Sequence, residues 1–174
     1  MKKKNKTDWL LEGLKVLEEK GFNKLSIEEL CVRLNLTKGS FYHHFKNIEN
    51  YVESLMIYWK EENTLPFINK VNTKDNFLDK YYYLKELVAN ASHKKEQVIR
   101  GWSYSNPIVK FYLQQVDSFR LSFLKELRQI KGESKENTDH AAMLEYATLI
   151  GIQQLFPDIT KEELQQLQKF YDKI

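Results

Sequence analysis

The stretch from residue 26 to residue 46 restricts the fold of this chain more than any other, because it predicts two short helices joined by a tight turn. Ser26 is a good N-cap, and Glu29 stands three residues later, as in a capping box. Apolar residues then recur at helical spacing and give the first helix one apolar face: Ile27, Leu30, Cys31 and Leu34. Asn35 tolerates the left-handed conformation that ends a helix. Thr37 can cap the next helix through the Ser40 amide.

The second helix of this stretch has two different faces. At 100° per residue, Phe41 and Phe45 lie within about 40° of each other, so we expect both to face the core. The opposite side carries hydrogen-bonding, aromatic and cationic groups around a glycine: Gly39, Ser40, Tyr42, His43 and Lys46. A helix-turn-helix protein needs such a face when its second helix enters the major groove of DNA.

These residues resemble the N-terminal signature of the TetR family of transcriptional repressors. The resemblance covers about residues 7–56 and is nearly continuous over 36–47, with further matches at Gly21, Phe22, Ser26, Ile27 and Leu30. It implies double-stranded operator DNA as a partner, contacted by Ser26, Thr37, Lys38, Gly39, Ser40, Tyr42, His43 and Lys46. Of these, Ser26, Thr37 and Tyr42 are expected to anchor phosphates, and Lys46 to add charge.

Three positions depart from the family pattern. Cys31 replaces an alanine, and Asn35 replaces the turn glycine but can adopt the same backbone conformation. Ile48 stands where the family commonly has a lysine that touches the DNA backbone. This last departure favours an alternative hypothesis, a dimeric ligand-binding or interaction module with a degenerate DNA-binding head.

The charge distribution agrees with an N-terminal DNA-binding segment. The net charge is only +3, but residues 1–46 hold ten Lys and Arg against six Asp and Glu. Counterion release on DNA would use this excess. The first lysines form either a solvated tail or an arm that reaches the minor groove: Lys2, Lys3, Lys4 and Lys6.

Composition and hydropathy favour a globular, cytoplasmic protein with no membrane partner. Hydrophobic residues make up 42% and charged residues 29% of the sequence. No apolar run approaches the roughly 20 residues that a membrane span requires, and the basic N-terminus is followed by Thr7-Asp8-Trp9 instead of an apolar signal core. A single cysteine excludes an internal disulfide.

The remaining sequence predicts helices only, so the expected fold class is all-α with about nine helices. Most predicted starts are marked by capping residues or by proline at the first helical position: Thr7, Ser26, Thr37, Asn47, Thr73, Asn106-Pro107, Thr138 and Thr160 with Glu163. A further short helix is predicted from Lys94 to about Tyr104. Gly21, Pro66, Gly132 and Pro157 are predicted to end or bend helices, with a polar loop over 132–138. The predicted domains are a helix-turn-helix DNA-binding domain at 1–46 and a helical ligand-binding and dimerisation domain at 47–174. A helix from 47 to about 65 links them.

The larger predicted domain offers candidates for two sites. Aromatic residues either fill the core or line a pocket for a small hydrophobic or aromatic effector, with Trp59, Tyr82, Trp102, Phe119, Phe123 and Met143 as candidates. Small and apolar residues near the C-terminus suit a homodimer interface of four helices, with Ala142, Tyr146, Leu149, Ile150, Gln153, Leu164, Leu167, Phe170 and Tyr171 as candidates.

A second, softer resemblance extends over the C-terminal half. This half of the sequence is similar to the effector half of one branch of TetR-like regulators. The similarity lies at isolated positions, namely Arg100-Gly101-Trp102-Ser103, Asn106-Pro107, Val116-Asp117, Arg120, Ala142, Tyr146, Gly151 and Gln153. Asp117 and Arg120 can pair along one helix face, and either hold the domain together or contact an effector.

The sequence shows no nucleophile and base in a catalytic pattern, so we expect no enzyme and no cofactor. Cys31, His43 and His44 do not favour a metal site, since adjacent histidines on a helix diverge by about 100°. The resulting hypothesis is a homodimeric, ligand-responsive transcriptional regulator, expected to be a repressor that a small effector releases from a palindromic operator.

Overall fold

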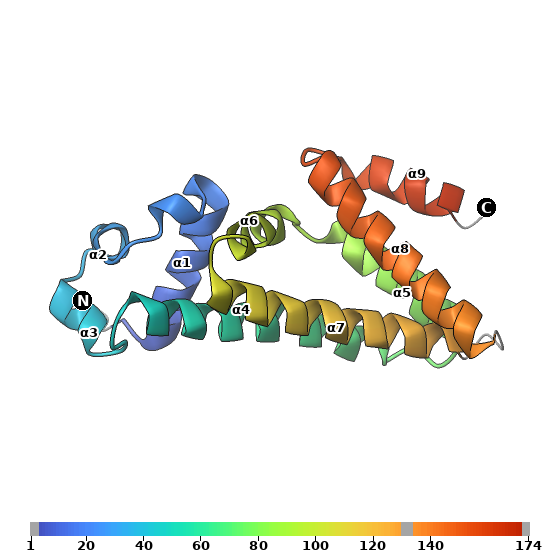
Figure 1. Ribbon diagram of the computed structural model, residues 1–174, viewed down its shortest axis with the longest axis horizontal. Helices are drawn as coiled ribbons and strands as arrows, with labels where there is room; N and C mark the ends of the chain where they lie inside the picture. Colours follow the sequence, from blue (N-terminus) through green and yellow to red (C-terminus); the bar gives the residue numbers. More distant parts are fainter. Residues whose placement is uncertain (1–3, 130–133, 172–174) are drawn as a thin grey trace. The chain divides into compact units, whose positions relative to one another are not determined.

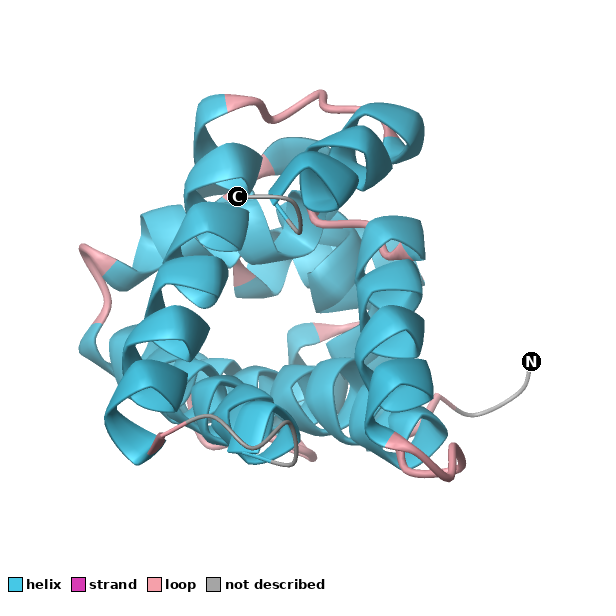
Figure 2. Cartoon of the chain, turned by 90° about the vertical axis from the view of Figure 1, so that its right-hand side faces the viewer, coloured by secondary structure: helices cyan, strands magenta, loops and turns pink. Residues whose placement is uncertain are grey.

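The computed structural model describes residues 4–129 and 134–171, and these are almost entirely helical. Nine α-helices, one short 3₁₀ turn and no strand occur within these ranges, which confirms the predicted all-α class (Figures 1 and 2). Lys2 and Lys3, predicted to belong to a solvated tail or to an arm, and the predicted helix end at Gly132 lie outside the described residues. No helix in the described part of the chain is long and apolar enough to cross a membrane.

The chain forms two compact units. The first contains Met1–Glu62 and Lys94–Gln115, and the second contains Asn63–His93 and Val116–Ile174. Two long helices, α4 (Ile48–Val71) and α7 (Pro107–Gln129), contribute residues to both units.

The first unit gathers the N-terminal helices around the start of α4. It comprises α1 (Lys6–Lys20), a 3₁₀ turn at Phe22–Lys24, α2 (Ile27–Leu34), α3 (Lys38–Tyr42), α6 (Lys94–Ser103) and the first parts of α4 and α7. α1 packs against α2 and α6, and α4 contributes buried side chains at Tyr51, Val52, Leu55, Met56 and Trp59. The compact unit is thus larger than residues 1–46, because the first turns of α4 complete its core. That 1–46 carries the DNA-binding role remains a prediction.

The second unit packs α5 (Phe77–Asn90), α8 (Lys135–Leu155) and α9 (Lys161–Tyr171) with the later parts of α4 and α7. Its core centres on Tyr81, Leu124 and Ala142. Asp117 and Arg120 each contact a neighbouring helix. Asp117 accepts a 2.7 Å hydrogen bond from the Tyr146 hydroxyl, and Arg120 donates to the Asn63 carbonyl at 3.3 Å. Both contacts tie α7 to neighbouring helices.

Most predicted helix boundaries are confirmed by their caps. Asn47 accepts from the Asn50 amide at 2.8 Å, and Asn106 accepts from the Ile108 amide at 3.0 Å. Thr160 and Glu163 form the predicted reciprocal pair at the start of α9. α8 ends at Leu155, just before Pro157.

Four predicted boundaries are wrong. The first helix is capped by Asn5 in a reciprocal pair with Asp8, because asparagine caps better than the threonine two residues later. Similarly, Asn76 caps α5 in place of Thr73, and Ser134 caps α8 in place of Thr138, which is buried inside the helix. Of the two alternatives predicted for Pro66, the helix end is wrong, because α4 continues to a buried Val71 with Pro66 inside it.

Candidate nucleic-acid interface

The turn between α2 and α3 has the conformation that the sequence predicted. The Ser26 hydroxyl accepts from the Glu29 amide at 3.1 Å, and the Thr37 hydroxyl accepts from the Ser40 amide at 3.3 Å. Asn35 is left-handed, with φ of 53° and ψ of 50°. Asn35 therefore adopts the backbone conformation that the usual turn glycine would have, and the two-helix geometry is kept.

A buried aromatic cluster fixes α3 on the first unit. Phe41 and Phe45 are fully buried, as predicted, with ring centroids 5.1 Å apart. The Trp9 ring meets Phe41 edge-on at 5.5 Å, and the Tyr51 ring meets Phe45 edge-on at 4.9 Å. The Tyr51 hydroxyl donates to the Trp9 carbonyl at 2.8 Å, and burial raises the pKa of Tyr51. This cluster anchors a helix too short to be stable alone.

The opposite face of α3 and the residues after it point to solvent. The exposed members of the predicted DNA-binding set are Thr37, Lys38, Gly39, Tyr42, His43 and Lys46, whereas Ser26 and Ser40 are half-buried. Tyr42 is 54% exposed although its neighbour Phe41 is buried. The Ser26 and Thr37 hydroxyl oxygens accept cap bonds from the Glu29 and Ser40 amides. The structure thus presents a polar, cationic surface, and contact of these residues with DNA remains a prediction.

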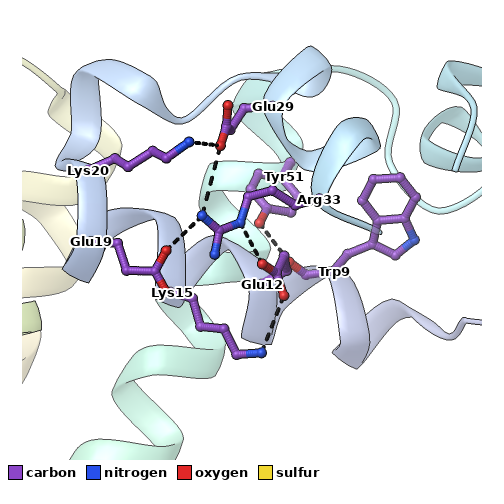
Figure 3. Close-up of polar contacts among 8 residues, drawn as sticks. All are labelled: Trp9, Glu12, Lys15, Glu19, Lys20, Glu29, Arg33 and Tyr51. Carbon is purple, nitrogen blue, oxygen red and sulfur yellow. Dashed lines mark hydrogen bonds and ion pairs between the residues drawn. The ribbon is translucent and has the colours of Figure 1, made fainter. Parts of the chain in front are cut away.

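An ion-pair cluster around Arg33 joins α1 to α2 (Figure 3). Arg33 Nε lies 2.6 Å from Glu12 Oε1, and Arg33 Nη1 lies 2.8 Å from Glu19 Oε2. Glu29 also pairs with Lys20, at 2.6 Å, which is why it does not complete the predicted capping box with Ser26. We call Glu12, Glu19, Glu29 and Arg33 the Arg33 cluster; sequence spacing did not predict it, because its members come from two helices.

The Arg33 cluster predicts a loss of stability in acid. Burial alone would raise the pKa of Glu12, but hydrogen bonds from Arg33 and Lys15 outweigh burial, so the pKa of Glu12 is lowered. The hydrogen bond from Arg33 also lowers the pKa of Glu19. A lowered carboxyl pKa stabilises the fold above the ordinary value, about pH 4.3, and this contribution is lost as pH falls through the lowered pKa. We expect the wild type to lose stability on acidification more steeply than Arg33→Met, as measured by urea unfolding between about pH 6 and pH 3. Lys95→Met, which removes the separate pair with Glu18, is the control and should keep the wild-type pH dependence. An identical pH dependence for Arg33→Met would contradict the prediction.

Two further positions bear on the predicted site. Ile48 is half-buried at the start of α4, and Lys46 is exposed two residues earlier, with its backbone amide bonded to Asn50. Cys31 is buried, and burial raises the pKa of its thiol. Over residues 4–129 and 134–171, no group of three or more His, Cys, Asp or Glu side chains could hold a metal ion.

The effector-pocket candidates are distributed over both units. Trp59 and Trp102 are buried in the first unit, where Trp102 stacks on Phe22 at 6.0 Å. The second unit contains Tyr82, Phe119 and Met143, each about half exposed, and Phe123, which is half-buried. That these side chains line an effector pocket remains a prediction.

The homodimer candidates differ in exposure. Ala142, Gln153 and Leu164 are buried within their own chain, so their side chains are not on the surface that a second copy could contact. Tyr146, Leu149, Ile150 and Tyr171 are half-buried, and Leu167 and Phe170 are exposed. The prediction missed other exposed apolar side chains on or next to α8, namely Leu144, Leu155 and Phe156. Helical periodicity ranks residues by face, and it cannot say which face the same chain covers.

The two short helices α2 and α3 and the tight turn between them form a helix-turn-helix motif, and the second helix has an exposed polar face above a buried aromatic cluster. Residues 10–55 match the family model described as bacterial regulatory proteins, tetR family. A search of curated protein sequences found no significant match.

Solved structures share the fold over almost the whole chain. A transcriptional regulator from Pseudomonas aeruginosa PAO1 has a TM-score of 0.79 at 15% identity, covering 97% of this chain and 88% of its own. The fatty acid degradation regulator FadR from Bacillus halodurans has a TM-score of 0.74 at 19% identity, covering 96% of each chain. AibR, solved in complex with isovaleryl coenzyme A and operator DNA, has a TM-score of 0.66 at 17% identity, covering 91% of this chain and 92% of its own. Residues 10–55 are thus similar to the tetR family of regulatory proteins, and the described part of the chain shares its fold with these solved regulators.

Proposed function

We propose that this protein is a repressor that binds a palindromic operator as a homodimer and leaves it when a small hydrophobic or aromatic effector binds. The observation that carries the proposal is the exposed face of α3, where Lys38, Tyr42 and His43 surround the small Gly39 above buried Phe41. A short recognition helix reads few bases, so two copies on a palindrome would multiply the specificity.

Selection of sequences from a random DNA pool by the purified protein, at two salt concentrations, tests the proposal. Enrichment of a palindrome, with affinity that falls steeply as salt rises, is the expected result. Recovery of no motif would favour the alternative of a ligand-binding module with a degenerate DNA-binding head, to which the half-buried Ile48 points.

Release by an effector would require coupling between a ligand site and the DNA-binding head. α4 starts next to the helix-turn-helix and continues into the second unit, which makes it the natural element to carry this coupling. A coupling free energy of about 1–3 kcal/mol suffices to change operator occupancy several-fold or more. AibR binds isovaleryl coenzyme A, so acyl thioesters belong in the first panel of effectors to be titrated into the complex with the selected DNA.

The proposed homodimer predicts that a charge on α9 breaks the assembly. Phe170 is 63% exposed and Leu167 is 41% exposed, and a second copy would remove such side chains from water. We expect Phe170→Glu to shift the protein from dimer to monomer in sedimentation experiments, because it would bury an unpaired carboxylate. Leu78→Glu makes the same kind of change at an exposed leucine of α5 and should leave the dimer intact. A dimer that persists unchanged in Phe170→Glu would exclude this face as the interface.

A further inference from the structure

The exposed surface of the helix-turn-helix contains an acidic side chain that pairs with a predicted DNA contact. Glu28 lies in the first turn of α2, and its carboxylate accepts a hydrogen bond from the ammonium group of Lys38 at the start of α3. Both side chains remain in solvent, with exposed fractions of 64% for Glu28 and 58% for Lys38.

Glu28 is separate from the Arg33 cluster. The Arg33 side chain is only 18% exposed and faces Glu12 and Glu19 of α1, whereas Glu28 pairs with the helix that follows the turn. Exposed ion pairs contribute little to stability, so the packing of α1 on α2 does not depend on Glu28.

The Glu28 carboxylate interacts with two residues of the predicted DNA-binding set. The hydrogen bond from Lys38 is the main cause that lowers the pKa of Glu28, and the Ser26 side chain makes a smaller contribution in the same direction. A DNA phosphate also binds cations and hydroxyl groups. The Glu28 carboxylate therefore interacts with the same kinds of group that a phosphate would.

We propose that Glu28 takes the place of a DNA phosphate in the free protein and thereby limits the sequence-independent attraction of the recognition surface to DNA. The inference rests on the proposed function, since it presumes that this surface binds DNA. When DNA approaches, Lys38 either stays paired, and neutralises no phosphate, or leaves Glu28, and an uncompensated carboxylate then faces the polyanion. Both outcomes weaken phosphate-driven binding.

Glu28→Gln tests this inference, because it keeps the shape of the side chain and removes its charge. With the full chain and a random-sequence 30-base-pair duplex, we expect tighter binding than for the wild type. The plot of log affinity against log salt concentration should also have a slope that is more negative than that of the wild type by about 0.9. Between 50 and 200 mM salt this extra slope corresponds to about a 3.5-fold larger loss of affinity.

Two comparisons separate local pairing from overall charge. Glu61→Gln makes the same charge change at an exposed position of α4 outside the helix-turn-helix and should leave affinity and slope near the wild-type values. In a Lys38→Met background, Glu28→Gln should give a clearly smaller gain, because its partner is gone.

Each of three results would overturn the inference: no change in Glu28→Gln, an equal gain in Glu61→Gln, or the same gain with and without Lys38. Weaker binding by Glu28→Gln would also overturn it and would make Glu28 a positioning residue for Lys38. A wild-type protein that binds neither the random duplex nor any selected palindrome would instead refute the proposed function. Thermal unfolding followed by circular dichroism checks that all variants are folded.

Discussion

Replacing Tyr42 by alanine is expected to weaken operator binding by about ten- to hundredfold while the fold remains intact. The Tyr42 ring is 54% exposed and packs edge-on against Phe41 at 5.6 Å, so its hydroxyl is held on the outer face of α3. A hydrogen bond to a charged phosphate contributes about 1.5–3 kcal/mol, and each 1.4 kcal/mol is a factor of ten in affinity. Fluorescence anisotropy with the palindrome selected by the wild type measures the loss.

Two variants show whether this effect belongs to the hydroxyl and to this position. Tyr42→Phe keeps the ring and removes only the hydrogen bond, so it should lose nearly as much affinity as Tyr42→Ala. Tyr104→Ala removes a ring that is 94% exposed at the end of α6, and it should bind the operator normally. Normal affinity in Tyr42→Ala, or an equal loss in Tyr104→Ala, would exclude Tyr42 as a DNA contact.

The sequence predicted the helix-turn-helix in detail because its determinants are local. The caps at Ser26 and Thr37, the left-handed Asn35 and the buried pair Phe41 and Phe45 each depend on residues a few positions apart. Helix starts elsewhere were predicted where the signal was unambiguous, as at Asn106-Pro107. They were displaced by two to four residues where a second capping residue stood nearby, as with Asn5 near Thr7.

Features that depend on contacts between distant helices were not predicted. The Arg33 cluster joins residues of α1 and α2, and Glu28 reaches Lys38 across the turn, so no single periodic pattern contains either set. The same limit explains why Ala142, Gln153 and Leu164 were assigned to a dimer surface, although their own chain buries them.

One signal in the sequence did indicate a tertiary contact, and it was missed. An isolated glycine inside a helical pattern costs helix stability, so it usually has a packing reason. Gly13 lies in the middle of α1, on the side that meets α4. Its lack of a side chain leaves the space that the Tyr51 hydroxyl occupies.

Gly13→Ala is therefore expected to destabilise the protein, although glycine-to-alanine changes inside helices usually stabilise by about 1 kcal/mol. A Cβ atom at position 13 would lie 2.0 Å from the Tyr51 hydroxyl oxygen and 3.1 Å from its Cζ atom. Tyr51 is fully buried, packed against Phe41 and Phe45, and bonded to the Trp9 carbonyl at 2.8 Å, so it cannot move aside without cost. Overpacking costs about 1–3 kcal/mol and a broken buried hydrogen bond a similar amount. We expect a net loss of roughly 2–4 kcal/mol, measured by urea or thermal unfolding.

The comparison that isolates this contact is a double-mutant cycle with Tyr51→Phe. Removing the hydroxyl relieves the 2.0 Å clash, so Gly13→Ala should cost much less in the Tyr51→Phe background than in the wild type. Gly101→Ala is the matched control in α6 of the same unit, because its Cβ would meet only Phe22, at 4.0 Å, and it should be neutral or stabilising. Equal effects of Gly13→Ala and Gly101→Ala would mean that α1 and α4 separate readily. In that case the aromatic cluster beneath α3 would not be rigid enough to fix the recognition helix.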